Sequence, residues 1–203
     1  MNTPTITFIP AAEHAGIGKL CIPGVCTLES LYRHPNCPPL VKETLEKHVT
    51  WQMRCETPVH LALNLKNQYL PFRAAMAVFG VGDIDETEDV RLEITQDPTS
   101  SSMVRPTPAH KPTVSAFVRI KLNDSGIVQD CVVALTGAEN RRLSLPDTQM
   151  LVGKNLSKSV IQEFSNNVSE HYPCFKDIYG SESYRKAMIA VTLERALKEV
   201  NHE

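Results

Sequence analysis

The chain has 203 residues, 42% of them hydrophobic, and a formal net charge of −2 at pH 7. This near-neutral balance argues against a general binder of nucleic acids or of membrane surfaces, because both classes rely on a basic excess. No apolar run approaches the roughly 18 residues of a membrane-spanning helix and the first residues lack a signal-peptide pattern, so a cytoplasmic protein without a nucleic-acid or membrane partner is expected.

The first half of the chain predicts short strands and helices. Period-two alternation favours strands, while capping residues and prolines at first helical positions mark the helix starts. The expected elements are a strand at 5–10, a helix from Thr27 to about Pro35, a helix opening at Pro38–Pro39, a helix at 72–79 and a strand at 90–95.

Residues 97–112 differ in composition from both flanks. They contain the run Ser100–Ser102 and four prolines. Serine and proline clusters between periodic segments are typical of linkers. The domain boundary is therefore expected here.

The second half opens with a β-hairpin pattern. Apolar residues recur at every second position from Val114 to Leu122, so one face of this strand is expected to be buried. Asn123–Gly126 supplies residues that tolerate a positive φ, and a β-branched run from Ile127 to Leu135 leads back. The sequence therefore predicts an antiparallel pair of strands.

The pattern then changes to a helical period. Ser157 is placed to cap one amphipathic helix, and Ser181 a second one that ends near Asn201. Besides its regular stripe, the second helix carries Tyr184, Met188 and Val191 on other faces. Apolar residues on more than one side predict burial on more than one side, against the N-terminal half or another subunit.

Three strings in this half carry a family resemblance: 132–138, 151–156 and 177–185. The spaced combination of Leu-x-Gly-Lys and Ser-x-x-Tyr-Arg after a hairpin resembles the C-terminal domain of the flavoprotein (medium) subunit of molybdenum hydroxylases, the carbon monoxide dehydrogenase and xanthine dehydrogenase family. The resemblance implies an α+β fold whose C-terminal lobe is a three-stranded antiparallel sheet covered by helices. It also implies a remnant of the second FAD-binding subdomain at 5–96, a linker at 97–112 and the flavoprotein C-terminal domain at 113–203.

The first half resembles the same family. The family pattern runs Ile-Gly-Ala, Thr-Leu, His-Pro, Pro-x-Leu, Gln-Ile-Arg-Asn and then a Thr-x-Gly-Gly-Asn loop. The matching positions are Ile17–Lys19, Thr27–Leu28, His34–Pro35, Pro39–Leu40 and Gln52–Cys55.

Two departures concern the flavin. The family's first flavin-binding subdomain would precede residue 10, where this chain has no room for it. In the second loop, His60 and Leu61 stand where the glycine pair would let backbone amides approach a pyrophosphate, and Tyr69 replaces an acidic residue. The positions that the resemblance assigns to the cofactor are those of the altered loop: Arg54, Thr57, His60 and Asn64.

The residues themselves show no complete catalytic set and no metal site. Arg54 faces a phosphate in one interpretation, and pairs with Glu56 or caps a loop in the other. The six cysteines are scattered without a Cys-x-x-Cys pair, which favours reduced, buried thiols.

Three functions remain open. The first is an FAD-type electron-transfer subunit of a molybdenum hydroxylase, with weakened or lost flavin binding. Its partners would be molybdopterin and iron–sulfur subunits, or a chain that supplies the missing flavin subdomain. The second is a non-catalytic scaffold, assembly or regulatory partner without FAD. The third, a small-molecule module unrelated to redox work, rests on no specific motif.

Overall fold

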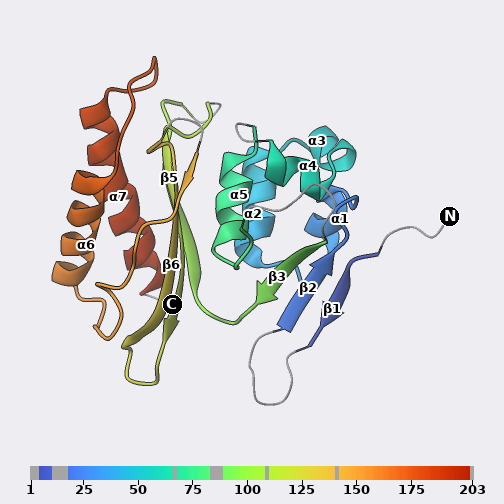
Figure 1. The fold of residues 1–203 in the computed structure, drawn as a ribbon, viewed down its shortest axis with the longest axis horizontal. Helices are drawn as coiled ribbons and strands as arrows, with labels where there is room; N and C mark the ends of the chain where they lie inside the picture. Colours follow the sequence, from blue (N-terminus) through green and yellow to red (C-terminus); the bar gives the residue numbers. More distant parts are fainter. Residues whose placement is uncertain are drawn as a thin grey trace. The chain divides into compact units, whose positions relative to one another are not determined.

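Helices and antiparallel sheet are combined in both halves of the chain, which confirms the expected α+β class (Figure 1). The computed structural model describes residues 5–10, 18–65, 68–82, 89–107, 110–139 and 142–201. The chain forms two units, unit 1 (residues 1–96) and unit 2 (residues 97–203).

Unit 1 contains a three-stranded antiparallel sheet in the order β1-β2-β3. The strands are β1 (Thr7–Ile9), β2 (Gly18–Ile22) and β3 (Val90–Ile94). Leu20 of β2 lies opposite Leu92 of β3, and both side chains are fully buried. This is the alternation that places one face of a strand in the core.

Five helices complete unit 1: α1 (Leu28–Arg33), α2 (Pro39–His48), α3 (Trp51–Glu56), α4 (Val59–Asn64) and α5 (Leu70–Ala77). The expected cap is confirmed, because the Thr27 hydroxyl accepts a hydrogen bond from the Ser30 amide at 3.2 Å. Helix α4 corrects one expectation. Where the family resemblance implied a loop after Arg54, Pro58 precedes a helical turn whose Val59 and Leu63 side chains are buried.

Unit 2 contains a four-stranded antiparallel sheet in the order β4-β5-β6-β7. The strands are β4 (Thr99–Val104), β5 (Val114–Leu122), β6 (Val128–Thr136) and β7 (Leu143–Ser144). The predicted hairpin is confirmed as β5 and β6. Its turn is closed by the Asn123 side-chain oxygen, which accepts from the amides of Ser125 and Ile127, and Gly126 takes a φ of +72°.

Strand β4 corrects the expected linker. Residues 99–104 pair with β5 across six positions, from Thr99 opposite Arg119 to Val104 opposite Val114. The buried Ser100 hydroxyl donates a 2.7 Å hydrogen bond to the carbonyl of Ala196. The serine run is therefore part of the sheet, because pairing and burial override a composition typical of linkers.

Helices α6 (Lys158–His171) and α7 (Glu182–Val200) cover one face of this sheet (Figure 1). Both expected serine caps are confirmed: Ser157 and Ser181 accept from amides three residues further on. Met188 packs against the core of this unit, whereas Tyr184 remains 40% exposed. Burial of a second side of α7, against unit 1 or another subunit, stays a prediction.

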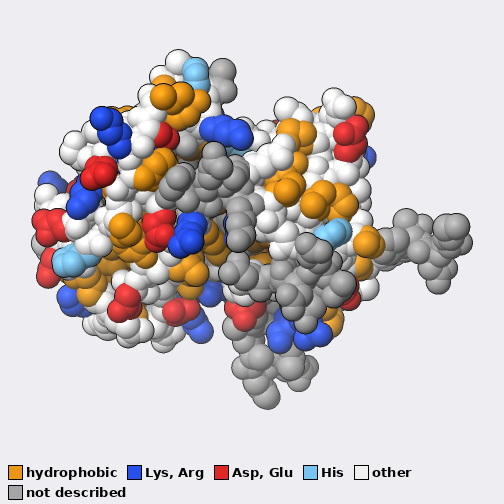
Figure 2. Space-filling view, turned by 45° about the horizontal axis from the view of Figure 1, so that its top comes forward, with side chains coloured by type: hydrophobic (Ala, Val, Ile, Leu, Met, Phe, Trp, Pro, Cys, Tyr) orange, Lys and Arg blue, Asp and Glu red, His pale blue; other side chains and the backbone are white. Residues whose placement is uncertain are grey.

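On the face drawn in Figure 2, acidic and basic side chains are interspersed over both units, in keeping with the net charge of −2. Among the described residues, none of the helices is both long enough and apolar enough to cross a membrane.

Candidate functional site

The four residues that the family resemblance assigns to a cofactor lie on or beside two consecutive short helices of unit 1. Arg54 is on α3, Thr57 follows its last turn, and His60 and Asn64 are one turn apart on α4. The site is thus a single continuous segment. What each side chain touches decides whether it is available to a ligand.

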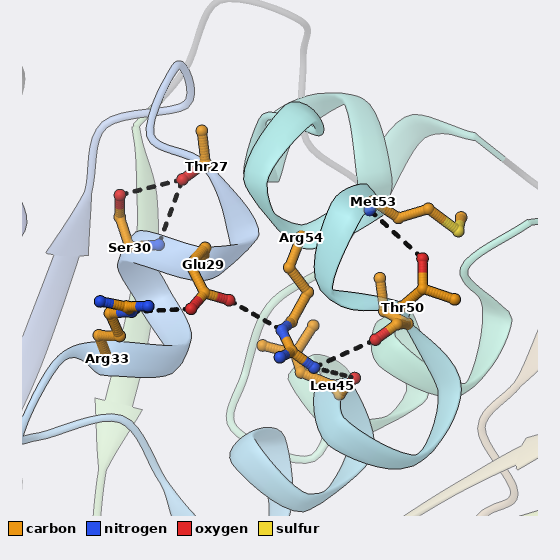
Figure 3. Close-up of polar contacts among 9 residues, drawn as sticks. Thr27, Glu29, Ser30, Arg33, Leu45, Thr50, Met53 and Arg54 are labelled. Atoms are coloured by element: carbon orange, nitrogen blue, oxygen red, sulfur yellow. Dashed lines mark hydrogen bonds and ion pairs between the residues drawn. The ribbon is translucent and has the colours of Figure 1, made fainter.

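Arg54 is bound inside the unit (Figure 3). Its Nε donates to Glu29 Oε2 of α1 at 2.9 Å, and its Nη1 donates to the Val49 carbonyl at 3.1 Å and to the Leu45 carbonyl at 3.4 Å. Its guanidinium also lies 4.6 Å from the centre of the Tyr32 ring. The arginine therefore joins α1 to the carboxyl end of α2, where a cation interacts favourably with the last carbonyls; the Leu45 carbonyl also accepts from the Val49 amide at 3.0 Å.

These contacts agree with the structural interpretation of Arg54, and its contact with a phosphate stays a prediction. The side chain has a structural role at a helix end, but the partner expected from sequence is wrong. Glu56 accepts from Gln52 at 3.2 Å, and the carboxylate that binds Arg54 is Glu29. No signal in a single sequence pairs these two residues, which are 25 positions apart.

Glu29 is the centre of this cluster. It also accepts from Arg33 Nε at 2.7 Å. Hydrogen bonds from Arg54 and then Arg33 hold the pKa of Glu29 below its ordinary value, against the opposing effect of burial. The ionised carboxylate therefore stabilises the folded state. This contribution is complete above the unfolded pKa of about 4.3 and is lost as pH falls through the lower folded pKa.

The lowered pKa of Glu29 predicts how the stability of a Glu29 variant depends on pH. In Glu29→Gln, the melting temperature is expected to fall below that of the wild type at neutral pH, and the difference is expected to shrink as pH drops below about 4. Thermal melts followed by circular dichroism across this range measure it. Glu43→Gln, which removes an exposed ion pair with Lys47, is the control and should change little. A difference that stays constant down to pH ~3 contradicts the argument.

Thr57 also forms its hydrogen bonds within unit 1. Its buried hydroxyl lies 3.0 Å from the hydroxyl of Tyr69, and its carbonyl accepts from the Leu28 amide at 2.9 Å. Tyr69 stands where the resemblance implies an acidic side chain, and sequence reasoning missed its contact with Thr57. Here a buried hydroxyl pair satisfies both polar groups without solvent.

His60 is turned toward the backbone. Its Nδ1 lies 2.5 Å from the carbonyl oxygen of Gly24, which also accepts from the His60 amide at 3.1 Å. A carbonyl only accepts, so Nδ1 carries the proton in this contact. The adjacent Val59 amide donates to the Cys26 carbonyl at 2.8 Å. His60 thus helps to join α4 to the segment before α1.

Asn64 differs from the other three candidates. Its amide Nδ2 is buried and has no hydrogen-bond partner among the described residues. A flavin pyrophosphate needs several convergent donors and a close backbone approach. Three of the four candidate side chains are committed to the unit's own contacts, and Leu61 adds a 42% exposed apolar side chain to the same turn. The segment therefore lacks the glycine-lined cradle that the family pattern describes.

The resemblance motifs of unit 2 are structural. In Leu-x-Gly-Lys, Gly153 takes a φ of +79°, and its amide and the Lys154 carbonyl both bond to Val128 at the start of β6. In Ser-x-x-Tyr-Arg, Ser181 caps α7. Arg185 donates to the carbonyls of Thr113 and Gly137 at 2.9 and 2.8 Å. Within the described chain, His, Cys, Asp and Glu side chains form no group of three or more that would hold a metal ion.

The antiparallel sheet of unit 2, with two helices on one face, makes it an α+β domain. Residues 103–200 match the family model of the CO dehydrogenase flavoprotein C-terminal domain, which confirms the resemblance seen in the sequence. No curated protein matches the chain at a significant level.

Solved structures extend the similarity over most of the chain. A CO dehydrogenase chain from Oligotropha carboxidovorans superimposes with a TM-score of 0.78 at 17% identity, covering 96% of this chain and 78% of that one. A chain of quinoline 2-oxidoreductase from Pseudomonas putida 86 gives 0.70 at 16% identity, covering 94% and 77%. A CO dehydrogenase chain from Hydrogenophaga pseudoflava gives 0.72 at 16%, with the same coverage. At these identities the likeness establishes the fold.

Proposed function

We propose that this protein is a flavoprotein-like subunit of a molybdenum hydroxylase in which flavin binding is weakened or lost. The matched domain at 103–200 supports the flavoprotein part of the proposal. One observation supports the weakened binding: Arg54, Thr57 and His60 bind Glu29, Tyr69 and Gly24 within unit 1. In this view unit 1 is a remnant of the second FAD-binding subdomain.

We also propose partner subunits and a cellular location for this chain. Three of the solved neighbours are CO dehydrogenases, and one of these is described as lacking the Mo-pyranopterin moiety of its molybdenum cofactor. We infer that the present chain associates with molybdopterin and iron–sulfur subunits in the cytoplasm. The alternative, a scaffold or assembly partner without FAD, is favoured by the same internal bonds of the candidate side chains.

Flavin titration tests the central claim. The purified full chain, with a cooperative melting transition as proof of folding, is titrated with FAD while flavin fluorescence is recorded. No saturable binding is expected at micromolar FAD, because the pyrophosphate would meet occupied donors and the side chains of His60 and Leu61. Saturation at micromolar concentration contradicts the proposal.

A second measurement separates the electron-transfer subunit from the scaffold. The chain is co-purified with its natural partner subunits, and the complex is examined for flavin absorption. Flavin bands that disappear when this chain is left out indicate a subunit that holds FAD together with a partner. If the complex assembles with this chain but has the same flavin content when the chain is left out, the chain acts as a scaffold.

A further inference from the structure

A tight turn before α7 presents two apolar side chains to solvent. The Asp177 amide donates to the Gly180 carbonyl at 3.1 Å, so Ile178 and Tyr179 occupy the two corners. The Asp177 carboxylate accepts from the amides of Tyr179 and Gly180 at 2.8 and 3.1 Å. Ile178 is 90% exposed and Tyr179 is 50% exposed. The turn therefore displays its apolar residues in a defined geometry.

A buried arginine holds this turn in place. Arg185 is 2% exposed, and its Nη2 donates to Asp177 Oδ1 at 2.6 Å. Its Nη1 is fixed by the carbonyls of Thr113 and Gly137, and its guanidinium lies 4.0 Å from the centre of the Phe175 ring. A turn braced in this way loses little conformational freedom on binding, which favours recognition by preorganisation.

Further side chains extend the apolar surface around the turn. The Tyr184 ring packs over Gly180, with Cδ1 2.8 Å from where a Cβ would be, and it is 40% exposed. His110 lies edge-on to Tyr179, with ring centres 6.3 Å apart. We call Ile178, Tyr179, Tyr184 and His110 the tip patch. Aromatic side chains around an exposed aliphatic one are typical of interface hot spots.

The rim of the tip patch is basic. Lys111 is exposed and adjoins His110, and Lys176 is exposed and adjoins the turn. Asp177 is already paired with Arg185, which leaves Glu182 as the exposed carboxylate that follows the turn. At this end of unit 2, Figure 2 shows hydrophobic side chains beside a histidine and basic side chains. A partner's acidic groups would complement this rim.

The size and charge of the patch restrict its occupant. The four side chains of the tip patch, of which Tyr179 and Tyr184 each offer at most roughly 150–250 Å², form the centre of an interface and fall short of the ~800 Å² per partner of a stable one. In a symmetric dimer across this patch, the two basic rims would face each other and repel. We propose that the tip patch binds a different protein, whose contact surface has an apolar hollow rimmed by Asp and Glu side chains. This goes beyond the proposed function and does not depend on flavin binding.

Site-specific photo-crosslinking tests the proposal. The full chain is expressed in its own cells with benzoylphenylalanine in place of Ile178, and separately in place of Val152, which is at the opposite end of the β5–β6 hairpin. One protein is expected to cross-link from position 178 and not from 152, through a segment rich in Asp and Glu. With that partner purified, Ile178→Ser should weaken binding at least about tenfold and Val152→Ser should leave it unchanged.

Two further measurements examine the basic rim of the tip patch and the alternative occupants of the patch. The Lys111→Glu, Lys176→Glu double variant is expected to slow association and to reduce its dependence on salt. Melting temperatures of all variants check that the fold is retained. The proposal is overturned by cross-linking to a second copy of this chain, by no cross-link at 178, by equal affinity of Ile178→Ser, or by a full chain that instead sediments with phosphatidylserine vesicles.

Discussion

Replacing Gly137 with alanine is expected to lower the free energy of unfolding by at least about 3 kcal/mol. Gly137 follows β6 with a φ of +84°, in the left-handed region that other residues adopt only with strain. A Cβ here would be 1.9 Å from the backbone carbonyl oxygen of Thr113. Because that carbonyl and the Gly137 carbonyl both accept from Arg185, relieving the clash would also break the anchor of the 177–180 turn.

Gly153 provides a matched control for this prediction. It has a similar φ of +79°, but no atom lies within 4 Å of the position of its added Cβ. Gly153→Ala therefore carries the backbone strain alone and should cost about 1 kcal/mol. Urea denaturation of both variants, followed by circular dichroism, measures the difference. Equal losses would show that the close approach to Thr113 contributes nothing.

Local patterns explain which parts of the fold could be predicted. The alternation from Val114 to Leu122 and the Asn123–Gly126 turn specify β5 and β6 without distant information. Ser157 and Ser181 cap α6 and α7 because a cap depends on residues within one turn. Such elements follow from neighbours in the chain, and sequence reasoning places them correctly.

The errors concern contacts between distant residues. Ser100 is buried because β4 pairs with β5 and because its hydroxyl reaches Ala196, 96 residues away. Composition alone predicts a linker there. The partner of Arg54 is missed for the same reason: sequence names Arg54 as a charged side chain near the altered loop, and only the packing of α1 against α3 brings Glu29 to it. The buried ion pair with Glu29 occupies Arg54, a side chain that the sequence alone would leave available to a ligand.

Arg54→Met is expected to lower the free energy of unfolding by about 3 kcal/mol. The Arg54 side chain is 11% exposed, and its loss leaves the equally buried Glu29 carboxylate with one partner and removes the side-chain donor from the carbonyls of Val49 and Leu45, of which Leu45 keeps the Val49 amide. Methionine fills a similar length with an apolar chain, so the effect reports the lost polar contacts rather than a large cavity. Chemical denaturation monitored by circular dichroism gives the value.

Arg33→Met is the control, because Arg33 binds the same carboxylate of Glu29 but is 71% exposed. Solvent screens an exposed pair, so this variant should lose less than about 1 kcal/mol. The comparison also bears on function. If Arg54 were held for a flavin phosphate rather than for the fold, its replacement would leave stability near that of Arg33→Met and would reduce FAD affinity instead. A large loss at Arg54 with a small one at Arg33 means that unit 1 needs this guanidinium to stay folded, and that a ligand phosphate would have to compete with Glu29 for it.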